Sequence, residues 1–276
     1  MQAASRESLA LARERLDSLV SGVAETDVDT LTLLGDQLAD VVGLLAGQPG
    51  LRRALADPSA PEAARVALLD GLLAGRLADP AVRTVRELVA ARWSRPDDLV
   101  DAVETLARLA ALAVAERDGS IEDVEDELFR FGRILDGQPR LCRMLADPTA
   151  PADRRVGLLD TLVAGKVGAV TGRLLGAAVR MPRGRALDQV AGELADLAAA
   201  RRDRYVAHVT APAALTAEQE ERLAGALSRV YGQAISLQVE LDPDLLGGLV
   251  VRVGEEIIDG SVSGRLDRAR QRLAGG

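Results

Sequence analysis

The side chains in this sequence that could carry out chemistry stand apart from one another. His208 is the only histidine, and it lies in a stretch that alternates like a β-strand. A general base needs a nucleophile and an orienting group nearby, so a histidine at the surface or at the edge of a core is the simpler interpretation. Cys142 is the only cysteine, so no intramolecular disulfide can form. Without a second ligand it is most simply a half-buried small hydrophobic residue.

Two further patterns match binding motifs only in part. Gly165-Lys166 is similar to the end of a phosphate-binding loop, but Val167 replaces the required Ser or Thr, and Asp160 stands where the first glycine belongs. The acidic runs 122–123 and 125–127 could supply oxygen ligands to a metal. We expect them to form a solvated helix face instead, because neighbouring helical residues point in different directions and no histidine joins them. The sequence therefore predicts no catalytic residue, no cofactor and no metal site.

Composition indicates a soluble globular protein. Of the 276 residues, 48% are hydrophobic and 28% are charged, which is too apolar for disorder and too charged for a membrane-spanning chain. The longest apolar run near the middle, Leu109–Ala115, is far shorter than the roughly 18 to 20 residues of a spanning helix. Residues 1–15 carry charges, so we expect no signal peptide, and any membrane association should come through another protein. The net charge of −8 argues against nucleic acid as the main partner.

The helices that carry most of the chain occur twice. Residues 47–75 return 90 positions later as residues 137–165 without a gap, with Gly-Gln-Pro, Leu-Ala-Asp-Pro, Ala-Pro, Leu-Leu-Asp and Ala-Gly in the same places. This many matches at one offset, including residues that end helices, indicates a repeated helical unit. In each copy an amphipathic helix precedes this run. Its apolar positions are Leu31, Leu34, Leu38, Val41 and Leu45 in the first, and Ile121, Val124, Leu128, Phe131 and Leu135 in the second.

A longer helix stands between the two copies. We expect it from Leu99 to Arg117, where it closes the first copy and also takes the place that Ser5–Val20 has before the first copy. It should therefore be the last helix of one bundle and the first of the next, and it should join them rigidly. Trp93, just before it, is either an exposed anchor for a partner or packs against the end of its own bundle.

The pattern changes beyond Arg204. Tyr205–Val209 and Ile235–Leu241 alternate like strands, a helix is expected from Thr216 to Tyr231, and Leu249–Gly254 leads through a short return to a final helix, Ser261–Leu273. The predicted fold is mainly α. It has two tandem six-helix-type bundles that share a helix, at residues 1–112 and 99–204, followed by a small α/β domain at residues 205–276.

The last forty residues resemble a known family. The run Leu246–Gly254, followed by Ile257–Ser261 and by an arginine-rich helix that begins at Gly264, closely resembles the C-terminal signature of the delta subunit of bacterial rotary (F-type) ATP synthases. This is the family of the mitochondrial oligomycin-sensitivity-conferring protein. The resemblance reaches back to about Leu99, and the doubled helical domain is similar to the extended form found in actinobacterial enzymes.

The resemblance implies a non-catalytic subunit of the peripheral stalk of a proton-translocating ATP synthase. In that family the helical domain receives the N-terminal helices of alpha subunits, and the C-terminal domain receives the end of the b subunit, so that the catalytic head resists the torque of the rotor. The resemblance thus implies alpha and b subunits as partners. It also implies a peripheral location on the cytoplasmic side of the cell membrane, within the complex.

The final helix is the candidate site for the b subunit. Its candidate residues are Arg265, Leu266, Arg268, Arg270, Arg272 and Leu273. Alternatively, the arginines only balance the C-terminal end of that helix. The extra helical copy could hold another alpha helix or brace the b subunit. The rival interpretation of the whole chain is a free-standing helical-repeat adaptor with an unrelated cytosolic partner, and an enzyme is a distant third.

Overall fold

The structure is a computed structural model that describes residues 1–24, 27–73, 75–203, 206–231, 235–242, 245, 247–254 and 256–261. It divides into a helical unit, Met1–Ala198, and a second unit, Ala199–Gly276. The predicted fold class is confirmed, because helices make up most of the chain and, within the described residues, a small sheet with one helix follows them.

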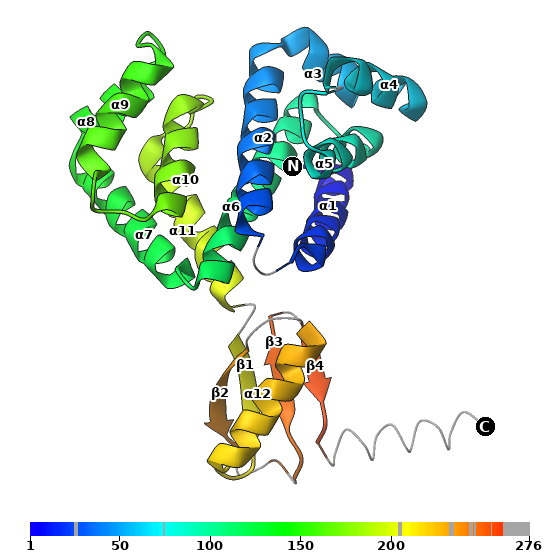
Figure 1. Ribbon diagram of the computed structural model, residues 1–276, viewed down its shortest axis with the longest axis vertical. Helices are drawn as coiled ribbons and strands as arrows, with labels where there is room; N and C mark the ends of the chain where they lie inside the picture. The colour runs from blue at the N-terminus through cyan, green and yellow to red at the C-terminus, as the bar shows by residue number, and fades with distance from the viewer. Residues whose placement is uncertain are drawn as a thin grey trace. The chain divides into compact units, whose positions relative to one another are not determined.

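The helical unit follows the repeat (Figure 1). Its helices, in chain order, are α1 (Ala3–Gly22), α2 (Val28–Gly47), α3 (Pro49–Ala56), α4 (Glu62–Leu73), α5 (Asp79–Ala90), α6 (Pro96–Asp118), α7 (Ile121–Gly137), α8 (Pro139–Ala146), α9 (Ala152–Val163), α10 (Ala169–Arg180) and α11 (Leu187–Asp203), the last of which continues past Ala198. Helices α2 to α5 and α7 to α10 are the two copies. Both α3 and α8 begin at a proline, where the missing N–H costs no helical hydrogen bond.

Helix α6 contacts both copies. It packs against α1, α2, α3 and α5 on one side of the unit and against α7 and α10 on the other. Its apolar residues belong to one hydrophobic core that runs through both copies, and Leu99, Val103 and Leu112 are fully buried in it. These are the contacts expected of a helix shared by two bundles. The domain boundaries 1–112, 99–204 and 205–276 stay a prediction.

Helix α2 passes a simple test for a membrane span. Among the described helices it is the one that is long and apolar enough to cross a bilayer by length and composition. A buried core helix meets the same test, and here Leu31, Leu34 and Leu38 are buried in the core shared with α6. These three side chains of α2 therefore serve the fold of the helical unit.

Two arginines at equivalent positions, one in each copy, connect helices within their own copy. Arg65 on α4 is 6% exposed and donates hydrogen bonds to the carbonyl oxygens of Ala90 and Ala91, at 3.1 and 3.0 Å. Arg155 on α9 is 7% exposed and donates to the carbonyl of Arg180 at 3.3 Å. The last carbonyls of a helix have no intrahelical donor, so each arginine caps the end of α5 or α10.

Trp93 packs inside the protein. Its side chain is buried, and its indole Nε1 donates a hydrogen bond to the carbonyl of Leu88 at 2.6 Å. Of the two roles left open by the sequence, packing against the end of its own bundle is the observed one.

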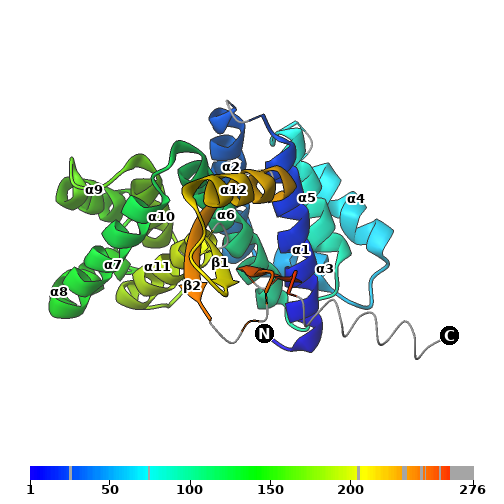
Figure 2. The same cartoon turned by 90° about the horizontal axis from the view of Figure 1, so that it is seen from below.

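The described part of the second unit is a sheet with one helix, α12 (Figures 1 and 2). Its elements are β1 (Val206–Ala211), α12 (Ala217–Tyr231), β2 (Ser236–Leu241), β3 (Val250–Val253) and β4 (Glu256–Asp259). The strand order is β2-β1-β3-β4, with β1 and β2 parallel and the other pairs antiparallel. Helix α12 begins with the expected capping box: Gln219 N donates to the Thr216 hydroxyl at 3.2 Å, and Thr216 N donates to the Gln219 side chain at 2.9 Å.

Two contacts link separate elements within this unit. Gly248 has a φ of +83°, and a Cβ atom there would lie 2.4 Å from the carbonyl oxygen of Gly260, so only glycine fits this part of the C-terminal signature. The hydroxyl of Tyr231, at the end of α12, donates to Glu256 on β4 at 2.7 Å. Burial, together with the Glu256 carboxylate, raises the pKa of Tyr231 to about 12.

Candidate partner-binding groove

His208 and Cys142, the two side chains considered for catalysis, lie within a strand and a helix of the fold. His208 lies on β1 opposite Arg252 of β3. Cys142 is half-buried on α8, with its sulfur 3.6 Å from a carboxylate oxygen of Asp188. Within the described ranges, no group of three or more His, Cys, Asp and Glu side chains could hold a metal ion.

One residue of the acidic run differs from the expectation of a solvated face. The carboxylate of Glu127 accepts hydrogen bonds from the backbone N–H of Gly168, at 3.0 Å, and from the hydroxyl of Thr171. It therefore caps the N-terminus of α10, where a negative charge is favourable. In the first copy the equivalent residue is Gln37, which accepts from the N–H of Ala78 at 2.9 Å at the start of α5. The repeat could have indicated this capping role, because Gln37 and Glu127 occupy equivalent positions 90 residues apart.

The six residues predicted to receive a b subunit lie outside the described residues. They are Arg265, Leu266, Arg268, Arg270, Arg272 and Leu273.

A groove of about 450 Å³ opens where the two copies meet, between α2, α6 and α10. Small residues line it at helical spacing. They are Gly35, Ala39 and Gly43 on α2, Ala107 and Ala111 on α6, and Gly176, Ala177 and Ala178 on α10. Such residues leave space along the contact because no long side chain fills it, and they give the groove a mainly apolar floor.

Glycine allows two helix backbones to approach along this groove. A Cβ atom at Gly35 would lie 3.4 Å from the backbone nitrogen of Ala111 and 3.5 Å from the carbonyl oxygen of Ala107. A methyl group at this position would just make van der Waals contact with α6, so a larger side chain would meet the α6 backbone. In the second copy, 90 residues later, the same place holds Glu125.

Charged residues lie along the two edges of the groove. Asp36 and Asp40 lie on α2, both exposed, and among the described residues neither forms an ion pair. Across from them, Arg173 donates to the Thr32 hydroxyl at 3.2 Å, and Arg180 pairs with Asp153 at 3.0 Å. The α2 edge is thus left with two carboxylates whose charge is not neutralised by an ion pair.

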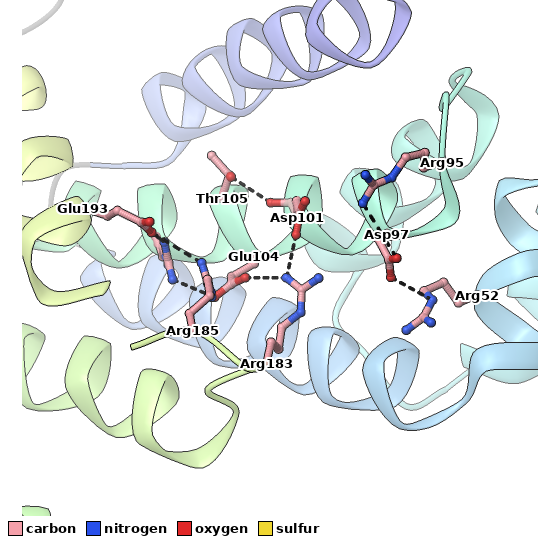
Figure 3. Close-up of polar contacts among 10 residues, drawn as sticks. Arg52, Arg95, Asp97, Asp101, Glu104, Thr105, Arg183, Arg185 and Glu193 are labelled. Atoms are coloured by element: carbon pink, nitrogen blue, oxygen red, sulfur yellow. Dashed lines mark hydrogen bonds and ion pairs between the residues drawn. The ribbon is translucent and has the colours of Figure 1, made fainter. Parts of the chain in front are cut away.

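An ion-pair network joins α6 to the loop between α10 and α11 (Figure 3). Glu104 on α6 accepts from Arg108 at 2.6 Å, from Arg183 at 2.7 Å and from Arg185. Arg183 also pairs with Asp101 at 2.8 Å. We call Glu104 and these arginine and aspartate partners, together with Glu193, which pairs with Arg108 and Arg185, the Glu104 network.

The Glu104 network is balanced in charge, and its centre is largely removed from water, whereas Asp101 and Glu193 at its periphery are 42% and 52% exposed. The side chain of Glu104 is 13% exposed and that of Arg183 15%. Burial acts to raise the pKa of Glu104, but the charges of Arg108 and Arg185 outweigh it and hold the pKa below its ordinary value of 4.5. Burial also lowers the pKa of Arg108. Glu104 is therefore ionised at neutral pH, and it fixes the α10–α11 loop against the middle of α6.

Arg183 is held in an unusual backbone conformation. Its φ is +53°, in the left-handed region that residues with a side chain rarely adopt. Gly184, which follows, has a φ of +74°. A conformation of this kind costs energy and persists only where the surroundings hold it. The two carboxylates of α6 supply that restraint.

The second unit has a groove of its own. It is more open, with a volume of about 540 Å³, and it lies between α12, the loop before it and the start of β3. Leu215, Leu223 and Leu249 contribute apolar surface, and Arg222 contributes a positive charge. The residues that line these two grooves were not predicted from the sequence.

Comparison with known proteins relates the chain to one family. A family model described as ATP synthase delta (OSCP) subunit matches residues 107–273. The chain is 45% identical over 275 residues to "ATP synthase subunit delta" of Streptomyces griseus subsp. griseus, with 100% of each chain covered. It is 45% identical over 273 residues to "ATP synthase subunit b-delta" of Mycobacterium sp. (strain KMS), where the match covers 99% of this chain and 61% of the relative. The chain thus spans less than two thirds of the length of that relative.

Among solved structures, a chain in the Toxoplasma gondii mitochondrial ATP synthase hexamer is similar. The TM-score is 0.32 and the identity 22%, with 60% of this chain and 94% of that chain covered.

Proposed function

This chain belongs to the ATP synthase delta (OSCP) subunit family, and from that premise we propose that it joins the catalytic head of an ATP synthase to its peripheral stalk. In this role it is a non-catalytic subunit of an enzyme complex. Its place is on the cytoplasmic side of the cell membrane, to which it is attached through the complex. Its task is mechanical, because a head held by the stalk does not turn with the rotor.

One observation carries this proposal in the structure: the helix-lined groove between α2, α6 and α10. A hydrophobic groove between helices is a common receptor for the apolar face of an amphipathic helix. We assign the groove to an N-terminal helix of an alpha subunit. A joint under torque needs an affinity of about nanomolar, roughly 12 kcal/mol, which favours several such contacts over one.

The second partner is a b subunit. The name of the mycobacterial relative combines b and delta, which favours a close association between such parts. We assign the b terminus to the second unit, where the groove beside α12 offers apolar surface and Arg222. The arginines of the final segment stay part of this proposal. Reversing the charges of Arg265 and Arg268 should weaken b binding, and unchanged binding would count against their role.

Co-purification tests the proposed function. The tagged full-length chain, expressed in its own cells, should be recovered from membrane extracts together with alpha and b subunits. A free-standing adaptor should be recovered with neither. The purified chain alone should hydrolyse no ATP, and turnover that persists after removal of all other subunits would refute the non-catalytic role.

A further inference from the structure

We propose that the first copy completes the groove of the second by supplying an acidic wall, so that the groove selects an amphipathic helix with Lys or Arg along one edge. The wall consists of Asp36 and Asp40 on α2. The inference rests on the proposed function only for the source of the helix. Its chemistry follows from the groove itself.

The repeat provides an internal comparison for this wall. Asp36 has an equivalent in Asp126 of the second copy, but the equivalent of Asp40 is Arg130. On α7, Asp126 and Arg130 are one turn apart and form an ion pair at 2.9 Å. The second copy thus neutralises this edge within its own helix, as i,i+4 pairs of opposite charge do. On α2 the same two positions are both acidic, and like charges at this spacing destabilise a helix slightly.

The groove-lining residues of α2 also have different equivalents on α7, which does not line the groove. Ala39, on the groove side of α2, is replaced in the second copy by Phe129, whose side chain is 58% exposed, and Gly43 is replaced by Arg133. On α2, which lines the groove, these positions hold small residues and unpaired carboxylates, whereas on α7, which does not line it, they hold larger side chains and an ion pair. The small residues of α2 leave the groove open on the side of the first copy.

The size of the groove limits how that occupant binds. A helix with its side chains is about 10–12 Å across, so a space of about 450 Å³ admits a row of apolar side chains and not a whole helix. The backbone of the incoming helix then lies along the rim. Its flanking residues meet Asp36 and Asp40 there, while Arg108 at the floor is already paired with Glu104 and Glu193. On α10, Arg173 donates only to the neutral Thr32 hydroxyl, so its positive charge lies across the groove from the two carboxylates of α2. The charge along the α2 edge is negative, and the edge of the incoming helix that meets α2 is complementary when it is positive.

The test compares binding of one probe to variants of the full-length chain. The probe is a synthetic peptide of the first 25 or so residues of the alpha subunit from the same organism, titrated calorimetrically at low and at moderate salt. Asp36→Asn/Asp40→Asn should weaken binding about 3- to 30-fold, from two ion pairs of roughly 0.3–1 kcal/mol each. Asp40→Arg, which gives α2 the residue of the second copy, should weaken it at least as much. Higher salt should reduce the difference.

A matched control removes the same charge elsewhere. Glu7→Gln/Glu14→Gln on the exposed surface of α1 changes the net charge equally, and it should leave the affinity within about 2-fold. A peptide in which Lys and Arg are replaced by Glu should bind the wild-type chain more weakly and the Asp40→Arg chain better. Equal binding by the wild-type and Asp36→Asn/Asp40→Asn chains would overturn the inference, as would failure of the wild-type chain to bind the peptide.

These outcomes are distinct from failure of the proposed function. If the chain co-purifies with alpha and b subunits but the groove variants bind the peptide normally, the acidic wall is wrong and the stalk role stands. If the chain co-purifies with neither subunit, the stalk role itself is wrong.

Discussion

The Glu104 network should be the most sensitive polar feature of the helical unit. Replacing Glu104 by Gln keeps the shape of the side chain but leaves three arginines facing two carboxylates, Asp101 and Glu193. Breaking a fully buried ion pair costs roughly 3–5 kcal/mol. The loss here should be smaller, about 2 kcal/mol, because two acidic partners remain and the side chain of Arg185 is 30% exposed.

Tryptophan fluorescence measures this loss of stability in the helical unit, where the Glu104 network lies. Trp93 is the only tryptophan, and it is buried in the helical unit, so its emission reports urea unfolding of that unit alone. A loss of about 2 kcal/mol should lower the melting temperature by roughly 4–8 °C for a unit of this size. Asp153→Asn is the control, because the Asp153 side chain is 92% exposed in its pair with Arg180 and should matter by less than about 0.5 kcal/mol.

The pH dependence gives the prediction a second readout. The pKa of Glu104 is lower in the folded chain than its ordinary value of 4.5, so its contribution is fully present above that pH. The contribution is lost as the pH falls below 4.5 and through the folded pKa. The stability curves of the wild type and Glu104→Gln should therefore lie apart at pH 7 and converge in acid. Curves that coincide at pH 7, or that stay equally far apart in acid, would refute this account of the network.

Three smaller changes test other contacts. Gly35→Val should destabilise the helical unit by roughly 1–3 kcal/mol in urea unfolding, because a side chain there meets the α6 backbone; Gly71→Ala on α4, with nothing within 4 Å, should be neutral or stabilise by up to about 1 kcal/mol. Gly248→Ala should unfold the second unit, seen by circular dichroism with tryptophan fluorescence unchanged, because of the carbonyl 2.4 Å away and the positive φ. Tyr231 should ionise near pH 12 in an absorbance titration, and Glu256→Gln should lower this pKa. The pKa of Tyr231 is raised only in the folded chain. The stabilisation from its contact with Glu256 is therefore present below the ordinary pKa of 10.0 and is lost as the pH rises toward 12.

The helices were predictable because their signals are local. The stripe of Leu31, Leu34 and Leu38 is buried as its spacing predicts, and prolines and glycines end the helices within a few residues of the expected places. The capping box at Thr216 was readable for the same reason. Patterns within one or two helical turns thus determined most of the secondary structure.

The candidate groove and the Glu104 network were not predictable in this way. Arg183 and Arg185 are 79 and 81 residues away from Glu104 in the chain, and no spacing rule joins residues so far apart. The groove depends on which faces of α2 and α10 turn toward each other, which is a property of packing. A weak signal existed, since positions 35, 39 and 43 hold small residues that the second copy does not repeat.

The positions at which the two copies agree and differ separate stability from binding. Arg65 and Arg155 agree and cap helix ends inside each copy, so they maintain the bundle itself. Asp40 and Arg130 differ, and Asp40 lies beside the groove where one copy faces the other. Residues that maintain the bundle, such as Arg65 and Arg155, are needed in both copies of a duplicated unit. Residues beside the groove, such as Asp40, are free to change once the copies occupy different surroundings. A substitution of Asp40 should therefore alter partner binding with little effect on the free energy of unfolding. A substitution of Arg65 should lower the free energy of unfolding with little direct effect on partner binding.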